Sequence, residues 1–143
     1  MTTRLLLTLG TVLFCGGSAR ATEPSPPPEP RGLCEVVADA KSHGHTVRLR
    51  GVYFRGFEKS YLADRGCKER VWVSWAEGGG RESEPARRMR ASGGVGGMPV
   101  VVEGVFHGTG PDGKPRGYGH LGACPAMIEV AAVLEAGVKS PAK

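Results

Sequence analysis

Two segments of the chain share one pattern of strand-forming residues interrupted by glycine. Residues 47–53 (VRLRGVY) and 100–106 (VVVEGVF) each place a glycine, Gly51 or Gly104, before a valine and an aromatic residue. Glycine weakens a strand, so inside one it marks a sharp bend or the close approach of another backbone. Small barrels need such bends where strands turn a corner to close the sheet. The pair therefore predicts a small, strongly curved β-barrel.

Alternation of apolar and polar residues predicts five strands, over residues 46–54, 60–64, 71–75, 98–106 and 127–134. In the last strand the residues expected to share one face are Ile128, Val130, Ala132 and Leu134. A short helix over 32–40 precedes the strands, and Gly44 is expected to supply a left-handed turn after it. A glycine-rich insertion separates the third and fourth strands and carries a helical turn over 84–91.

These features predict a mainly β fold, a single five-stranded OB-like barrel with a short N-terminal helix. Five strands, bending glycines in the first and fourth, and a long loop or helical turn between the third and fourth are typical of that architecture. A six-stranded or SH3-like barrel is the alternative.

Several segments together resemble a group of small exported bacterial proteins with OB-like barrels. They are residues 47–54, 61–67 (YLADRGC), 100–106 and 117–122 (GYGHLG). The resemblance covers nearly all of the chain after the leader, and its motifs are structural ones. It implies an exported barrel and leaves the activity to be argued from individual residues.

The first 21 residues have the organisation of a signal peptide. Arg4 is followed by an apolar run over 5–14 and by the cleavage pattern Ser18-Ala-Arg-Ala21. The run is too short to span a bilayer, which takes about 20 apolar residues. We expect export to the periplasm or the extracellular space. The alternatives are a buried helix and a lipid anchor at Cys15, which the bulky Phe14 before it disfavours.

The remaining chain divides into a linker, one domain and a tail. Residues 22–31 form a proline-rich linker, expected to be extended polyproline II. The barrel domain is expected over 32–137, with a disordered tail over 138–143.

The charge of the chain is compatible with an anionic partner. Cleavage after Ala21 would remove Arg4 and Arg20 but no acidic residue, so the net charge would fall from +5 to +3. This is less basic than dedicated nucleic-acid-binding domains. The densest cluster, four arginines between positions 81 and 90, is expected to be a solvated face.

Three cysteines remain after cleavage, which is an odd number for an oxidising compartment. They are Cys34, Cys67 and Cys124. At most one intramolecular disulfide can form. We expect Cys34–Cys67, which would tie the N-terminal segment to the loop after the second strand, and a small buried Cys124.

Ligand binding is the activity that the fold and its aromatic residues favour. OB barrels bind through the face of their second and third strands and through adjoining loops. Here that face and the first strand supply the predicted ligand-binding residues Arg48, Arg50, Phe54, Tyr61 and Trp72. Aromatic rings interleaved with arginines suit stacking combined with charge neutralisation. We expect a glycan, an anionic envelope component or a protein as partner, with nucleic acid disfavoured by export.

Catalysis finds little support in the sequence. There is no C-x-x-C motif and no paired-carboxylate motif, so we expect a non-catalytic protein without a cofactor. The alternative is a metal- or haem-binding carrier or a small enzyme that uses His107, His120 and Cys124.

Overall fold

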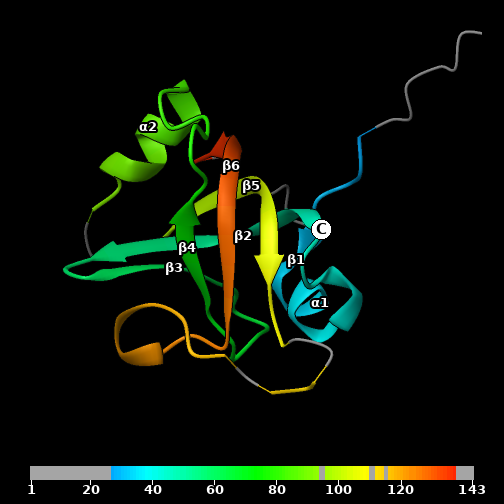
Figure 1. Ribbon diagram of the computed structural model, residues 1–143. Coiled ribbons are helices and arrows are strands. Elements are labelled where there is room, and N and C mark those ends of the chain that lie inside the picture. Colours follow the sequence, from blue (N-terminus) through cyan, green and yellow to red (C-terminus); the bar gives the residue numbers. More distant parts are fainter. Residues whose placement is uncertain (1–26, 94–95, 110–111, 115, 138–143) are drawn as a thin grey trace, which may run out of the picture.

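A computed structural model describes residues 27–93, 96–109, 112–114 and 116–137 of the chain (Figure 1). The predicted signal peptide, the alternative lipid-anchor residue Cys15 and the predicted tail over 138–143 lie outside the described residues, as does the first half of the proline-rich linker, residues 22–26.

Five strands close into a barrel. They are β2 (Thr46–Gly56), β3 (Lys59–Ala63), β4 (Val71–Trp75), β5 (Met98–His107) and β6 (Ala126–Ala136). Strand β2 pairs antiparallel with β3 on one side and with β5 on the other, which closes the sheet. Strands β4 and β6 are parallel, while β5 and β6 are antiparallel. This order confirms the predicted five-stranded OB-like barrel, and the parallel pair excludes the SH3-like alternative.

The N-terminal helix is shorter than the sequence pattern predicts. Gly32 pairs with β2 as part of the two-residue parallel strand β1 (Arg31–Gly32), and α1 covers only Leu33–Ala38. Asp39 is extended, with φ −91° and ψ 101°, and its carboxylate accepts a hydrogen bond from the Lys41 backbone N–H at 3.0 Å. This cap starts a separate 3-10 turn over Ala40–Ser42, because Asp competes well with helix continuation by bonding nearby backbone.

The predicted helical turn in the insertion is confirmed as α2 (Glu84–Ala91). The Ser83 hydroxyl accepts a hydrogen bond from the Ala86 N–H at 3.3 Å, an N-cap that favours helix initiation. Ala86 and Met89 are fully buried, and Arg88 Nη1 donates to the Ala136 carbonyl at the end of β6. Figure 1 shows α2 and α1 at opposite ends of the molecule.

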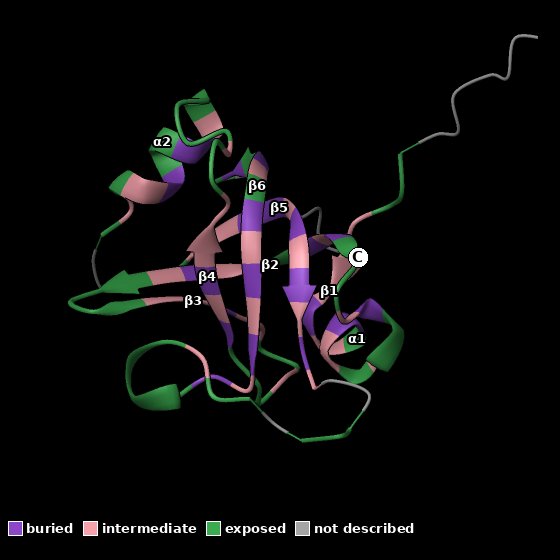
Figure 2. Ribbon diagram, viewed as in Figure 1, coloured by how far each residue is buried: buried purple, intermediate pink, exposed green. Residues whose placement is uncertain are grey.

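Buried residues alternate with partly buried ones along much of the strands (Figure 2). The largest fully buried side chains of the strands, which form the barrel core, are Leu49, Leu62, Val71, Val102, Phe106, Ile128 and Val130. In β6 the predicted alternation is wrong after Val130. The pairing of β5 with β6 shifts register twice, so Val133 and Ala136 are buried while Leu134 is exposed. Each bulge inserts an unpaired residue and reverses the face of the residues beyond it, so Val133 faces inward after the first shift and Ala136 after the second.

No helix within the described residues is long and apolar enough to cross a membrane.

Candidate binding face

Three aromatic side chains form a row across the outer surface of β2, β3 and β4. Phe54 pairs directly with Tyr61, and Tyr61 pairs directly with Trp72. All three are half-buried, whereas their sequence neighbours Tyr53, Leu62 and Val71 point into the core. Directly opposed side chains on neighbouring strands are close enough to interact. The structure thus brings together the three aromatic residues predicted from the sequence, and we call them the aromatic row.

Tyr61 is flanked on both sides. The rings of Phe54 and Tyr61 are stacked, with centroids 5.4 Å apart and planes inclined by 19°. The Arg70 guanidinium carbon lies 4.9 Å from the centroid of the Tyr61 ring. Since β3 lies between β2 and β4, Phe54 and Arg70 approach Tyr61 from opposite sides. Arg70 is exposed, so a ligand can displace it from the ring or pair with its charge.

A loop between β5 and β6 lies against Trp72. A β-carbon at Gly119 would overlap the indole ring, so only glycine fits between the loop backbone and Trp72. Gly119 has φ 75° and ψ −165°, a conformation that is essentially restricted to glycine. Two backbone hydrogen bonds between Tyr118 and Cys124 close the base of this loop.

Among the described residues, the most exposed large apolar side chains are at the tips of the two loops beside the aromatic row. Phe57 in the β2–β3 turn is 90% exposed, and Leu121 in the β5–β6 loop is 91% exposed. The two loops meet where His120 Nδ1 lies 3.4 Å from Glu58 Oε2. Phe57 and Leu121 were not predicted from the sequence, nor was Arg70, because only the folded chain places them beside the row.

The two predicted arginines of the first strand lie apart from the aromatic row. Arg48 Nε is 2.6 Å from Glu103 Oε2 on β5, and Nη1 donates to the Pro28 carbonyl. Arg50 is exposed on the same outer side of β2. At about 3.3 Å per residue, they are about 20 Å and 13 Å along the strand from Phe54. A ligand on the aromatic row would reach them only if it extended along β2.

The three residues proposed for metal or enzyme chemistry lie in separate surroundings. His107 Nε2 is 3.6 Å from Glu129 Oε2, while His120 contacts Glu58. Cys124 is buried, and desolvation raises the pKa of its thiol. No group of three or more His, Cys, Asp or Glu side chains in the described part of the chain is arranged to hold a metal ion.

Cys34 on α1 and Cys67 after β3 are neighbours, as the predicted disulfide requires. Both are thiols in the structure, and a hydrogen bond between them raises the pKa of Cys34 to about 11. Cys67 packs against the core. Their pairing as a disulfide stays a prediction.

One solved structure has a distant likeness to this chain. No protein-family model matches the chain, and no curated protein matches it. The crystal structure of asparaginyl-tRNA synthetase from Pyrococcus horikoshii complexed with asparaginyl-adenylate aligns with 22% sequence identity and a TM-score of 0.39. The alignment covers 79% of this chain and 24% of the synthetase chain.

Proposed function

We propose that this protein is an exported, non-catalytic binding module of the bacterial envelope whose ligand is an anionic glycan or another anionic envelope component. The observation that carries the proposal is the aromatic row Phe54–Tyr61–Trp72 with Arg70 beside it. Ring surfaces next to an exposed arginine suit ligands that combine apolar ring faces with negative charge, as uronic-acid polymers do.

The tryptophan content of the chain provides a direct binding assay. There are two tryptophans, so a Trp75→Phe variant leaves Trp72 as the only one. Titration with alginate, a polyuronate, should change the Trp72 emission in a saturable and salt-sensitive way, whereas neutral dextran should not. Tyr61→Ala in this background should weaken alginate binding at least about fivefold. Arg70→Gln should weaken it and reduce its salt dependence.

A matched control distinguishes binding at the aromatic row from non-specific attraction of alginate to a basic protein. Arg87 is exposed on α2 and is not part of the aromatic row, and Arg87→Gln removes the same charge as Arg70→Gln. If Tyr61→Ala, Arg70→Gln and Arg87→Gln all bind alginate as tightly as the Trp75→Phe protein, the aromatic row is not the ligand site. Absence of binding to alginate and to purified envelope fractions would reject the ligand class.

A protein partner is the second candidate, and the exposure of Phe57 and Leu121 favours it. Exposed apolar side chains beside an aromatic surface are typical of interaction sites. A Phe57→Ser/Leu121→Ser variant should lose a protein partner but retain alginate binding. Loss of alginate binding in that variant, with the fold intact, would assign the loop tips to the glycan site.

Export is testable on its own. The signal pattern predicts a mature chain that begins at Thr22. The intact mass of protein recovered from the periplasm or medium of an expressing bacterium should match that start. A chain that retains Met1 in the cytoplasm would contradict export, and an acylated chain starting at Cys15 would establish the lipid anchor.

A further inference from the structure

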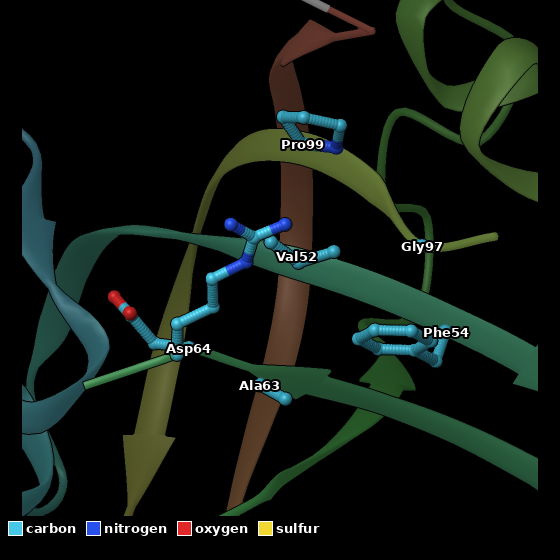
Figure 3. Close-up of a pocket in the computed structure, with 7 residues that line it drawn as sticks. Val52, Phe54, Ala63, Asp64, Gly97 and Pro99 are labelled. Carbon is cyan, nitrogen blue, oxygen red and sulfur yellow. The ribbon is translucent and has the colours of Figure 1, made fainter. Parts of the chain in front are cut away.

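A small cavity opens on the outer surface of the barrel next to Phe54 (Figure 3). Its floor is a cross-strand row in which Val52 on β2 pairs with Ala63 on β3 and with Pro99 on β5. Phe54 and Gly97 line one side, and Asp64 and Arg65 line the other. The cavity has a volume of about 340 Å³, near the lower end of the range for small-molecule sites.

Small residues and a chain turn keep this space open. A β-carbon at Gly97 would overlap the Val52 side chain and lie 2.6 Å from the Phe54 ring. The Gly97 backbone therefore lies directly against these two side chains. The short side chain of Ala63 leaves space above the floor of the cavity, and β3 ends at this residue. The Gly66 N–H then donates to Asp64 Oδ1 at 3.0 Å, which turns the chain away from the sheet.

The two charged residues at the rim differ in what they offer a ligand. The Asp64 carboxylate accepts the Gly66 hydrogen bond, and Figure 3 shows it directed away from Val52 and Phe54. Arg65 is exposed and has no ion-pair partner among the described residues. A ligand would therefore meet an apolar floor, an aromatic wall and the exposed positive charge of Arg65.

We propose that this cavity is a binding site for a small aromatic carboxylate, with the ring on Val52 and Ala63 against Phe54 and the carboxylate paired with Arg65. The volume accommodates one six-membered ring with a short substituent. The apolar floor favours an aromatic ring over a hydroxylated one, since buried hydroxyls would lack hydrogen-bond partners there. This site is separate from the proposed glycan site, although both use Phe54.

Three probes of similar size test the ligand class by NMR of the ¹⁵N-labelled protein. Phenylacetate carries both ring and charge, phenylacetamide carries the ring alone, and glucuronate carries the charge on a hydroxylated ring. Phenylacetate should give saturable shifts centred on Val52, Ala63 and Gly97. Phenylacetamide should bind at the same place but about three- to fivefold more weakly, as expected for loss of one solvent-exposed ion pair. Glucuronate should leave these signals unchanged.

Variants then assign the roles of the lining residues. Arg65→Gln should weaken the binding of phenylacetate about three- to fivefold and leave the binding of phenylacetamide unchanged. The control Arg87→Gln should affect the binding of neither compound. Ala63→Leu should fill the cavity and abolish both. If that variant does not fold, Arg65→Gln with the two ligands still decides the question.

Several results would overturn the inference. They are shifts that do not saturate or that map elsewhere, equal binding of phenylacetate and phenylacetamide, and binding of glucuronate at Val52 and Ala63. The Tyr61→Ala variant distinguishes the two sites, because it should weaken alginate binding at least about fivefold and leave phenylacetate binding unchanged. Loss of both ligands in a folded Tyr61→Ala protein would show that the cavity is part of the glycan site.

Discussion

The backbone of Gly104 on β5 lies directly against the carbonyl of Glu129 on β6. A β-carbon at Gly104 would overlap the Glu129 carbonyl oxygen and lie 2.8 Å from its carbon. The register shift between Glu103 and Gly104 occurs at the same point of the ladder. Gly104 is therefore the position where β5 bends to let β6 approach and complete the barrel.

Gly104→Ala should destabilise the protein by about 3 kcal/mol, since two backbones would have to separate. Gly51→Ala is the matched control, because a β-carbon there meets its nearest neighbours at 3.4–3.6 Å, ordinary contact distances. It should change stability by less than about 1 kcal/mol. Urea unfolding followed by tryptophan fluorescence measures both. Equal losses in the two variants would contradict the different roles assigned to these glycines.

Gly119→Ala should lift the β5–β6 loop from Trp72. The added methyl group would overlap the indole ring, and the backbone conformation at Gly119 is one that alanine rarely adopts. In the Trp75→Phe background, Trp72 emission should shift to longer wavelength and its quenching by acrylamide should increase. Gly44→Ala is the control, since Gly44 has a similar φ of 76° with nothing within 4 Å of the added carbon. Unchanged Trp72 emission in Gly119→Ala would show that the loop does not depend on this contact.

The free energy of unfolding should fall at acidic pH because the Asp39 carboxylate becomes protonated. The hydrogen bond from the Lys41 N–H, followed by the one from Arg31, lowers the pKa of Asp39 below its ordinary value of 3.8. A carboxyl whose pKa is lower in the folded state stabilises the fold above the unfolded-state pKa, and the contribution is lost as pH falls through the folded-state value.

Asp39→Asn should therefore reduce stability at neutral pH and flatten the decline below about pH 4. Glu135→Gln, at an exposed position of β6, should leave the decline unchanged. Urea midpoints between pH 2 and 7 measure the effect. Parallel curves for wild type and Asp39→Asn would assign acid sensitivity to other groups.

Cys34 and Cys67 should form the single disulfide of the oxidised protein, and Cys124 should remain a thiol. The pKa of Cys34 is raised to about 11, so only a small fraction of its thiol is deprotonated at neutral pH. Oxidation proceeds through the thiolate and should therefore be faster in alkaline buffer. Closing a loop of this length stabilises a fold by about 3–4 kcal/mol in the chain-entropy model.

Peptide mapping identifies the bond, and urea unfolding with and without a reductant measures its contribution. Buried Cys124 should react with iodoacetamide only after unfolding. A disulfide that includes Cys124, or equal stability of the oxidised and reduced proteins, would contradict this assignment.

The strands and their inward faces follow closely from the sequence, whereas the end of β6 does not. Val71 and Val73 alternate with Trp72 in the predicted way, because β4 pairs with β6 without interruption. Leu134 was assigned to the wrong face, since the bulges in the β5–β6 pairing depend on the partner strand. The predicted helix over 32–40 was too long because the Asp39 cap competes with helical hydrogen bonds.

The sequence by itself determined the architecture of this protein. Strand period and bending glycines are local signals, and each is recognised within a few residues of the chain. Only the tertiary structure decided which further side chains lie beside the three aromatic residues predicted from the sequence. Arg70, Phe57 and Leu121 lie beside the aromatic row, and Arg48 pairs with Glu103, which is 55 residues away in the chain. Such neighbours are fixed by strand register and loop closure, which no local pattern specifies.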